Sequence, residues 1–420
     1  MACAESGKND SGECGTGEDR SCDRAGGVIY GKENEATQYM ERKAVKKILH
    51  ISKYYYPFRG GTEQVARDCV LALGKDCWQI VFCFNHLKGD REDMVDGIRV
   101  VRCGCQARVA SQSLSASFGR RLGRIMDEFG PDTVVFHYPN PFAAHFLLKY
   151  LRPGAGIRLL TYWHLDITRQ KILGKLFFVQ NKRLLARSWK VIATSPNYVE
   201  GSPFLNEIRD KCTVIPNCIS RERLECTPET VEQGQEIRGR HPGKILCLAV
   251  GRHVAYKGFS YLVRAGEMLD ERFEIYIAGE GELTSKLKRL GKRNGRIHFL
   301  GRIDDMTLKA WLCAADIFCF PSITKNEAFG IALAEAMYFG KPAVTFTIPG
   351  SGVNYVSIGG ETGLEVEKQD PAAYAEALGK LGDHPEIRER YGKAAAGRVR
   401  EHFMYEQFCR NIRELFLEQE

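Results

Sequence analysis

The sequence predicts an α/β protein built from two doubly wound parallel sheets. Short runs of β-branched and aromatic residues alternate with longer segments of helical periodicity, and this alternation stops near the middle of the chain and then starts again. The length of 420 residues agrees with two domains, because one hydrophobic core rarely serves more than about 250–300 residues. The dispersed 42 Gly and 15 Pro and the hydrophobic content of 44% exclude collagen, coiled coils and wholesale disorder.

The first 41 residues are rich in Gly, Ser, Asp and Glu and almost free of aliphatic side chains. Such a segment cannot bury enough surface to fold, so we expect a disordered tail over 1–41. Met40 opens the run MERKAVKKILHIS, which leads directly into the first strong strand pattern. We therefore hypothesise that Met40 rather than Met1 is the initiator, and an intact native mass that includes residue 1 would reject this.

The first domain is assigned to residues 42–220. Helical segments are expected near residues 62–74, 114–129 and 170–187. The expected strands are KILHIS, WQIVFCF, IRVVRC, DTVVFHY, RLLTYW and KVIATS.

The second domain is assigned to residues 221–402, after a polar stretch without strands from about Ser220 to Gly243. Its expected strands are KILCLAV, FEIYIAG, RIHFL, DIFCFPS and PAVTFT, each followed by a candidate helix. The last segment, 403–420, predicts a helix that packs one face back on the first domain. Its apolar residues at helical spacing are Phe403, Phe408, Ile412 and Leu415.

The fifteen Cys residues do not predict a disulfide framework. Most stand singly inside apolar runs, as Cys83, Cys247 and Cys319 do, where a free Cys behaves as a small hydrophobe. The close pair Cys103 and Cys105 has no second Cys/His pair to complete a metal site. No apolar run approaches the roughly 20 residues of a membrane-spanning helix, and the N-terminus is polar and acidic. We expect a reduced, cytoplasmic protein without a metal.

Charge is distributed unevenly along the chain. Residues 42–215 hold 28 Lys and Arg against 14 Asp and Glu, whereas residues 216–420 hold 28 against 29. This asymmetry suggests that the first domain faces an anionic partner, with nucleic acid, an acidic lipid leaflet and a phosphorylated acceptor as candidates. An ordinary solvated basic surface explains it equally well.

The loops that follow the strands of the second domain are the expected ligand site, because ligands bind at the carboxyl ends of open parallel sheets. The loop GRHVAYKG puts two cations, Arg252 and Lys257, five positions apart after a buried strand, which suits a diphosphate. Gly251 and Gly258 flank them and allow the backbone to approach a ligand. Two surface cations on a loop are the alternative.

Two further loops give weaker signals. Gly279, Glu280 and Gly281 form a Gly-rich turn between strand and helix whose amides suit a phosphate or a ribose. Gly301 and Arg302 follow the next strand.

The segment NEAFGIALAE is the most specific in the chain. Glu327 precedes a predicted helix, and Phe329, Gly330 and Ile331 lie at its first turn, where unpaired N–H groups favour an anion. Glu335 lies deeper among apolar residues and requires a partner, either ribose hydroxyls or a basic side chain. A helix-terminal charge and a structural ion pair are the alternatives for the two glutamates.

The first domain has its own candidate residues. Gly60 and Gly61 open a helix after the aromatic loop KYYYPFR, so that backbone amides can approach a phosphate. His137 lies at one strand end, and His164 and Asp166 at another. A lone strand-end His is more often structural than catalytic, but two of them facing an expected interdomain cleft favour function.

Together these motifs resemble the retaining glycosyltransferases of the GT-B fold, in particular family 4 (glycosyl transferases group 1), from about Lys47 to the C-terminus. The E-x7-E spacing of Glu327 and Glu335 is the most specific element, supported by GRHVAYKG, AGEG, FLGR, PSITKNEAFG, the GG loop and VIPN. Where the family usually continues VIPN with Gly-hydrophobic-Asp, this chain has Cys218-Ile219-Ser220.

The resemblance implies a role for each candidate residue. Arg252 and Lys257 would bind the donor diphosphate with help from the backbone at Gly61, and Glu335 would hold the ribose. Glu327 would bind hydroxyls of the donor sugar. The remaining implied contacts are the amides around Phe329 and Gly330 on sugar or phosphate, His137 beside the reacting sugar, and His164 and Asp166 on the acceptor side.

The resemblance also implies a reaction, the retaining transfer of a hexosyl group from a UDP- or GDP-sugar to a glycan. No metal is required if Arg252 and Lys257 stabilise the leaving diphosphate. We expect a lipid-linked acceptor in cell-surface polysaccharide biosynthesis, no further cofactor and no nucleic-acid partner. The basic stretch QKILGKLFFVQNKRLLARSWK would suit peripheral binding to the inner face of the plasma membrane.

Two alternatives remain at this point. The first is a GT-B synthase that acts on a soluble sugar, which dependence on a lipid-linked acceptor or on anionic vesicles would distinguish. The second is a catalytically silent scaffold that binds a nucleotide-sugar, against which the presence of all four charged residues of the donor motifs argues.

Overall fold

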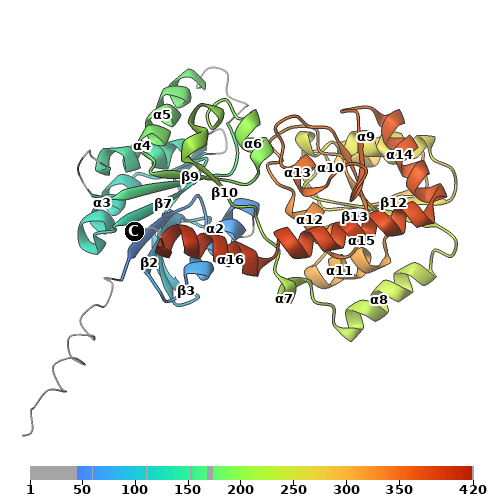
Figure 1. The fold of residues 1–420 in the computed structure, drawn as a ribbon, viewed down its shortest axis with the longest axis horizontal. Helices are drawn as coiled ribbons and strands as arrows, with labels where there is room; N and C mark the ends of the chain where they lie inside the picture. The colour runs from blue at the N-terminus through green and yellow to red at the C-terminus, as the bar shows by residue number, and fades with distance from the viewer. Residues whose placement is uncertain are drawn as a thin grey trace, which may run out of the picture. The chain divides into compact units, whose positions relative to one another are not determined.

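The computed structural model describes residues 45–58, 60–109, 112–151, 154, 156–167 and 174–418. The expected tail 1–41, the Met40 hypothesis and the start of the basic stretch around Lys171 lie outside these residues. From Lys46 onward the chain forms one compact unit. It contains two large sheets and a small hairpin (Figure 1).

The first sheet has eight strands in the order β10-β9-β8-β7-β1-β2-β4-β3. All of its pairs are parallel except β3 with β4, so an antiparallel edge strand departs from the expected parallel sheet. Its strands are β1 (Lys47–Ile51), β2 (Trp78–Phe84), β3 (Arg91–Val95), β4 (Ile98–Cys103), β7 (Thr133–Tyr138), β8 (Arg158–Trp163), β9 (Lys190–Ala193) and β10 (Cys212–Val214). Strands β5 (Ala107–Val109) and β6 (Gln112–Leu114) form the hairpin.

Helices cover both faces of this sheet because successive strand residues point to opposite faces. Ile48 belongs to the cluster that contains α2 and the C-terminal helix, whereas its neighbours Leu49 and Ile51 join the cluster of α3 and α4. The helical elements of this part of the chain are α2 (Gly61–Leu73), α3 (Phe118–Phe129), α4 (Pro141–Tyr150), α5 (Gly174–Arg187), α6 (Pro196–Gly201) and the 3-10 turn η1 (Asn206–Lys211).

The C-terminal helix α16 (Tyr405–Arg413) packs beside α2 of the first domain, and a π-helical turn, η3 (Glu414–Glu418), follows it (Figure 1). Phe408, Ile412 and Leu415 are buried there. Phe403 is not on this helix: it lies in the core of the second domain. The helix therefore begins two residues later than the apolar spacing suggests, because Phe403 belongs to the chain segment that crosses between the domains.

The second sheet has six parallel strands in the order β13-β12-β11-β14-β15-β16, with the doubly wound reversal next to its first strand, β11. Its strands are β11 (Ile245–Val250), β12 (Phe273–Ala278), β13 (Ile297–Gly301), β14 (Ile317–Phe320), β15 (Ala343–Phe346) and β16 (Gly363–Val366). The helical elements are α7 (Arg221–Leu224), α8 (Pro228–Gly239), η2 (Ala255–Lys257), α9 (Phe259–Met268), α10 (Thr284–Gly291), α11 (Asp305–Ala314), α12 (Ile331–Tyr338), α13 (Val353–Val356), α14 (Pro371–Asp383) and α15 (Pro385–His402).

The chain crosses from the first domain to the second near Ile219 and returns at residues 403–405. The two crossings are hydrogen-bonded: Ile219 N–H donates to the Phe403 carbonyl at 2.9 Å, and Tyr405 N–H donates to the Ile219 carbonyl at 3.0 Å. The segment that departs from the family pattern, Cys218-Ile219-Ser220, is thus part of this two-stranded crossing.

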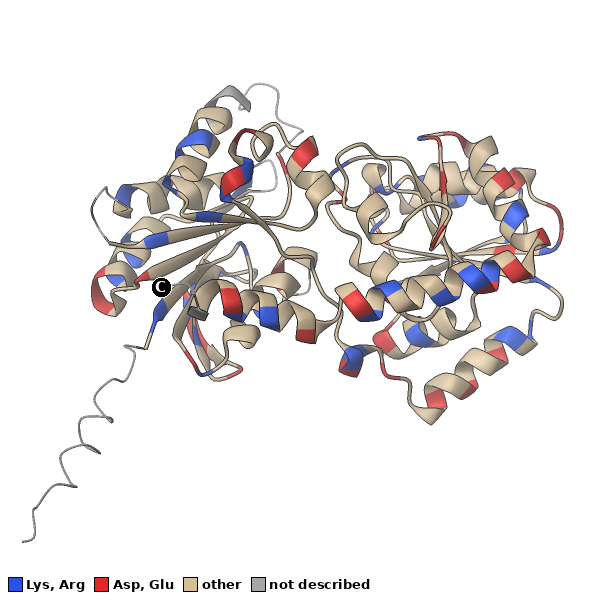
Figure 2. Cartoon of the chain, in the orientation of Figure 1, with Lys and Arg blue, Asp and Glu red and all other residues tan. Residues whose placement is uncertain are grey.

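The long helix α15 carries charges of both signs (Figure 2). No helix in the described part of the chain is long and apolar enough to cross a bilayer.

Candidate functional site

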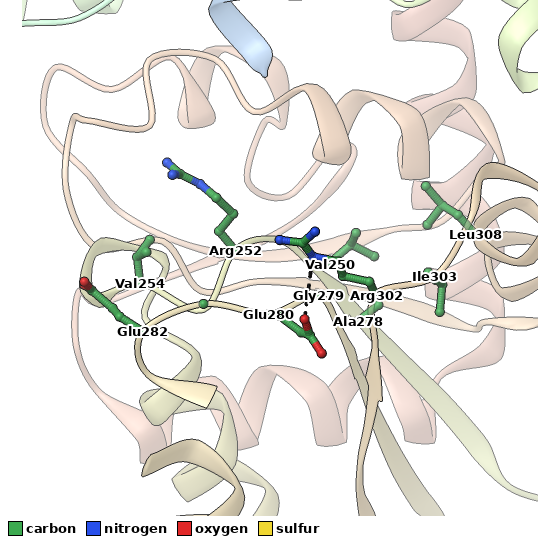
Figure 3. Close-up of a pocket in the computed structure, with 12 residues that line it drawn as sticks. Val250, Arg252, Val254, Ala278, Gly279, Glu280, Glu282, Arg302, Ile303 and Leu308 are labelled. Atoms are coloured by element: carbon green, nitrogen blue, oxygen red, sulfur yellow. Dashed lines mark ion pairs between the residues drawn. The ribbon is translucent and has the colours of Figure 1, made fainter. Parts of the chain in front are cut away.

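A pocket of about 630 Å³ lies at the carboxyl ends of β11, β12 and β13. This is the edge where an open parallel sheet binds ligands, and the volume falls in the range of small-molecule sites, about 300–1,000 Å³. Figure 3 shows the side chains that surround it. The lining residues are Val250, Gly251, Arg252, Val254, Ala278, Gly279, Glu280, Gly281, Glu282, Arg302, Ile303 and Leu308.

Glycine is required in the floor of this pocket because backbone segments touch there. Gly279 has φ +116°, and a Cβ atom on it would lie 2.0 Å from the Gly251 carbonyl oxygen. A Cβ atom on Gly281 would lie 2.6 Å from the carbonyl oxygen of His253. The strand-to-helix turns can therefore bring their backbone amides to a ligand without a side chain in between.

Two of the predicted donor residues form an ion pair. Lys257 Nζ lies 2.5 Å from Glu327 Oε2, and both side chains are 12% exposed. Ser322 Oγ donates a second hydrogen bond to the same carboxylate oxygen at 3.1 Å. The Lys257 ammonium also lies 4.8 Å from the centroid of the Phe320 ring. The ammonium of Lys257, from the loop after β11, thus lies beside the Glu327 carboxylate, from the loop after β14.

The loop that carries Lys257 ends at Gly258, which has φ +66°. A Cβ atom there would lie 1.9 Å from the Pro321 carbonyl oxygen, so only glycine lets this loop approach the end of β14. Arg252, at the start of the same loop, is exposed and lines the pocket (Figure 3).

Helix α12 begins at Ile331, with Gly330 as its N-cap at φ +96°. Phe329 therefore lies one residue before the cap, and not in the first turn as predicted. The residue is 2% exposed and its ring packs edge-on against Phe403, so the Phe329 side chain belongs to the core. A Cβ atom on Gly61 would lie 3.9 Å from Ile331 Cδ1, which places the GG loop next to this helix start.

Glu335 has a basic side chain as its partner, which was one of the two kinds of partner predicted for it. It is 5% exposed, and its Oε1 lies 3.1 Å from Nη1 of Arg223 in α7. Burial raises the pKa of the Glu335 carboxyl, and the charge of Arg223 partly offsets this. The pair joins residues 112 positions apart in sequence, which explains why the sequence alone did not reveal Arg223.

The two remaining predicted donor residues differ in their surroundings. A Cβ atom on Gly60 would lie 2.2 Å from the Glu63 carboxylate of the following helix, so this glycine makes room for an acid. Arg302 is 85% exposed and lies 3.6 Å from Glu280, at the rim of the pocket (Figure 3).

Lys53, on the loop after β1, lies within electrostatic reach of Arg108 and Arg252. Burial lowers the pKa of Lys53, Glu63 counteracts this, and the charges of Arg108 and Arg252 lower it further. A second, shallower pocket of about 420 Å³ lies in the same domain and is lined partly by Lys88 and Arg108.

The two predicted histidines stack on each other inside the first domain. His137 Nδ1 and His164 Nε2 share a hydrogen bond of 3.1 Å, and their ring centroids lie 5.4 Å apart. His137 is 3% exposed and His164 4%. Burial lowers the pKa of His164 to about 3. Burial also lowers the pKa of His137 well below its usual value, and the nearby His164 and His50 lower it further. Both rings are therefore neutral at pH 7.

This arrangement changes the interpretation of the pair. His137 Nε2 is buried without a hydrogen-bond partner among the described residues, so it has free capacity for a ligand atom. His164 Nε2, by contrast, is already hydrogen-bonded to His137. The position of His164 on the acceptor side stays a prediction.

Asp166, the other residue predicted on the acceptor side, is also buried, with 3% exposure. Its Oδ1 accepts hydrogen bonds from Trp163 Nε1 and Ser202 Oγ, both at 2.9 Å. Its Oδ2 pairs with Lys325 Nζ at 2.8 Å. Asp166 is thus a buried structural anion whose partner comes from the segment that carries Glu327.

Within the described residues no group of three or more His, Cys, Asp or Glu side chains is arranged to hold a metal ion. Metal independence stays a prediction, because it concerns the reaction.

Comparison with known proteins identifies the family. The family model described as Glycosyltransferase Family 4 matches residues 59–223, and the model described as Glycosyl transferases group 1 matches residues 244–384. The chain belongs to glycosyltransferase family 4. The fold of this glycosyltransferase is GT-B, as the resemblance implied.

Curated relatives span nearly the same length as this glycosyltransferase. It is similar to D-rhamnosyltransferase WbpZ of Pseudomonas aeruginosa, with 34% identity over 85% of this chain and 92% of the relative. It is also similar to O-antigen chain mannosyltransferase C of Escherichia coli, with 30% identity over 85% of this chain and 94% of the relative. Among solved structures, Anabaena HepE in complex with UDP and glucose has a TM-score of 0.72 at 16% identity, covering 89% of this chain and all of HepE.

Proposed function

We propose that this glycosyltransferase moves a hexosyl or deoxyhexosyl group from a UDP- or GDP-sugar to a glycan acceptor in cell-surface polysaccharide biosynthesis, with retention of configuration. The observation that carries the proposal is the Lys257–Glu327 ion pair, whose Lys257 side chain lies against Gly251 of the pocket lining. The names of the two curated relatives, a rhamnosyltransferase and an O-antigen mannosyltransferase, support the class of sugar and of product. The UDP and glucose in HepE support a nucleotide-sugar donor.

The chemistry requires stabilisation of a leaving diphosphate, because cleavage of a sugar–phosphate bond places negative charge there. Arg252 and Lys257 supply fixed positive charge, and the N–H groups at the start of α12 supply further donors. Lys257 forms an ion pair with Glu327. A bound diphosphate would attract this ammonium, while the Glu327 carboxylate would accept hydrogen bonds from donor-sugar hydroxyls.

We assign the nucleoside of the donor to the pocket. Its Gly-rich floor suits a flat base and a ribose. Glu335, which pairs with Arg223, would accept hydrogen bonds from ribose hydroxyls. His137 Nε2 would contact the reacting sugar from the first domain. Two cations at the diphosphate can perform the role that a metal ion performs in other transferases, which is why we propose a metal-independent reaction.

For the acceptor we propose a lipid-linked glycan at the inner face of the plasma membrane. Helix α5 supports this, because Phe178 and Val179 are 40% and 49% exposed next to the exposed cations Lys182 and Arg183. An amphipathic surface of this kind binds an anionic bilayer through apolar burial and about 1 kcal/mol per basic residue. Arg187 continues the basic side, while Leu184 and Leu185 face the core.

The test combines donor binding, transfer and product analysis. Thermal shift with UDP, GDP, ADP and their common sugars identifies the nucleotide, since a ligand that binds the folded state raises the Tm. Transfer is then measured to a lipid-linked and to a soluble glycan acceptor, with and without EDTA, and the anomeric configuration of the product is read by NMR.

Each part of the proposal has its own contrary result. An inverted product would overturn retention, and loss of activity in EDTA that Mg²⁺ restores would overturn metal independence. Equal turnover of soluble acceptors without vesicles would favour a soluble-acceptor synthase. Nucleotide binding without transfer or donor hydrolysis would favour a catalytically silent scaffold.

A further inference from the structure

Lys325 links the segment that carries Glu327 to the first domain. It stands between β14 and α12 of the second domain, 25% exposed. Its Nζ donates to Asp166 Oδ2 at 2.8 Å and to the Gly201 carbonyl oxygen at 2.9 Å. Both acceptors belong to the first domain.

The carboxylate that Lys325 meets is fixed in place. Asp166 is buried, and its Oδ1 is held by Trp163 and Ser202. Its backbone N–H donates to the Tyr198 hydroxyl at 2.6 Å. Because both side-chain and main-chain atoms are anchored, Asp166 offers Oδ2 in one position, and Lys325 must come to it.

A second contact holds the same segment three residues further on. Thr194 Oγ1 donates to the Ala328 carbonyl oxygen at 3.0 Å. The Ala328 side chain is 9% exposed and packs in the hydrophobic cluster of the first domain, although Ala328 belongs to the second. The segment is therefore anchored on the first domain on both sides of Glu327.

Glu327 itself is held by the second domain. Its carboxylate pairs with Lys257 and accepts from Ser322, and its backbone carbonyl accepts from Ser351 Oγ at 2.5 Å. A residue with its side chain and carbonyl fixed by one domain, and with both flanks fixed by the other, occupies its position only when the two domains are in register.

From these contacts we propose that Lys325 is a positioning residue: clasped by Asp166 and the Gly201 carbonyl, it sets the place of Glu327 and makes that place depend on the first domain. The catalytic consequence rests on the proposed function, because it assumes that Glu327 contacts the donor sugar. Lys325 does not reach the pocket lining, so it acts through Glu327 and not on the nucleotide.

We call the contacts of Lys325 with Asp166 and the Gly201 carbonyl the clasp. Its loss should lower kcat without changing nucleotide affinity. The nucleotide pocket is lined by the second domain alone, so losing the clasp should leave nucleotide affinity unchanged. The sugar-contacting carboxylate would be misplaced, and a misplacement of about 1 Å at a reacting centre can cost about 10²-fold in rate.

The experiment uses the full-length protein with Lys325→Met, Asp166→Asn, the double variant and Lys325→Arg. The matched control is Arg124→Met, which removes an exposed ion-pairing cation of the first domain far from these contacts in sequence. We measure kcat and donor KM, nucleotide affinity by thermal shift with UDP and GDP, and deuterium uptake of peptides covering 194–202 and 323–330.

We expect Lys325→Met to lower kcat at least 10-fold while nucleotide affinity changes less than twofold. The double variant should be no worse than the more impaired single variant, Lys325→Arg should keep at least a third of wild-type kcat, and Arg124→Met should be unchanged. Deuterium uptake should rise in both peptides of Lys325→Met and in neither peptide of the control.

Several outcomes would overturn the clasp. These are a kcat of Lys325→Met within twofold of wild type, single-variant losses that multiply in the double variant, or deuterium uptake unchanged in both peptides. If Asp166→Asn does not fold, Lys325→Met against Lys325→Arg decides. If the wild type binds no nucleotide, the proposed function fails, and deuterium uptake alone then decides whether the clasp exists.

Discussion

Replacing Lys257 with Met tests the donor site most directly. The substitution keeps the length and apolar stem of the side chain and removes its charge. Glu327, 12% exposed and paired with Lys257 at 2.5 Å, then keeps the hydrogen bond from Ser322 among the described side chains. Two effects follow, one on folding and one on catalysis, and they are separable.

The effect on folding follows from the unpaired carboxylate. Breaking a buried ion pair by removing one partner costs about 3–5 kcal/mol. The residual exposure of both side chains and the remaining Ser322 hydrogen bond reduce this cost to about 2–3 kcal/mol. For a chain of this size this lowers the Tm by roughly 2–4 °C.

The effect on catalysis follows from the leaving diphosphate. Loss of one preorganised donor at a developing negative charge costs about 10²–10³ in kcat, or about 2.7–4 kcal/mol. The double variant Lys257→Met/Glu327→Gln removes both charges. It should regain most of the lost Tm and should stay as inactive as the single variant.

The assay is differential scanning calorimetry together with donor hydrolysis and transfer at saturating donor. Arg240→Met is the control, because Arg240 pairs with Glu236 on the exposed face of α8 and such pairs contribute less than about 1 kcal/mol. The reasoning is refuted if Lys257→Met keeps kcat within threefold of wild type. It is also refuted, for the folding part, if the double variant is no more stable than the single variant.

Three further predictions concern burial and backbone space. Burial lowers the pKa of His50 from about 6.5 to about 4, so protonation of this histidine favours the unfolded state as pH falls below 6.5. Urea titrations should show that His50 lowers the free energy of unfolding by about 2 kcal/mol at pH 5 relative to pH 7. Burial raises the pKa of Asp68 to about 6, so the protonated carboxyl favours the folded state below about pH 3.8 and this stabilisation is lost as pH rises through 6. Asp68→Asn should therefore be more stable than wild type at pH 7.5, by up to about 3 kcal/mol, and should show no such gain at pH 3.5. Gly279→Ala places a Cβ atom 2.0 Å from a carbonyl oxygen at φ +116° and should abolish the nucleotide-induced thermal shift, whereas Gly239→Ala, with open space around its Cβ position, should preserve it.

The strands that were predicted correctly are those whose burial is visible in the sequence. Continuous apolar runs such as WQIVFCF and KILCLAV are buried on both faces of a parallel sheet, so their composition alone marks them. Strand β3 was missed because REDMV is polar and largely exposed at the sheet edge. Strands β10 and β16 are short, and their sequences CTV and GLEV lack the apolar run that marks the equally short β14, IFCF.

The sequence by itself determined the α/β class, the two domains and the loops that follow each strand of the second domain, because burial and turn formation depend on neighbouring residues. It therefore located Arg252, Lys257 and Glu327 near one sheet edge. Only the tertiary structure decided their partners. Lys257 meets Glu327 70 positions away, because β11 and β14 are adjacent in the sheet although other strands separate them in the chain.

The same reason explains why the partners of His164 and Asp166 could not be predicted from the sequence. The sequence presented His164 and Asp166 as one strand-end pair, but folding separates their roles: His164 turns to His137 across neighbouring strands, and Asp166 is closed off by Lys325. Each of these contacts joins residues 27 to 159 positions apart, where local periodicity carries no information. Sequence pattern singled out these side chains as candidates, and only the packed chain determined which other residues they contact.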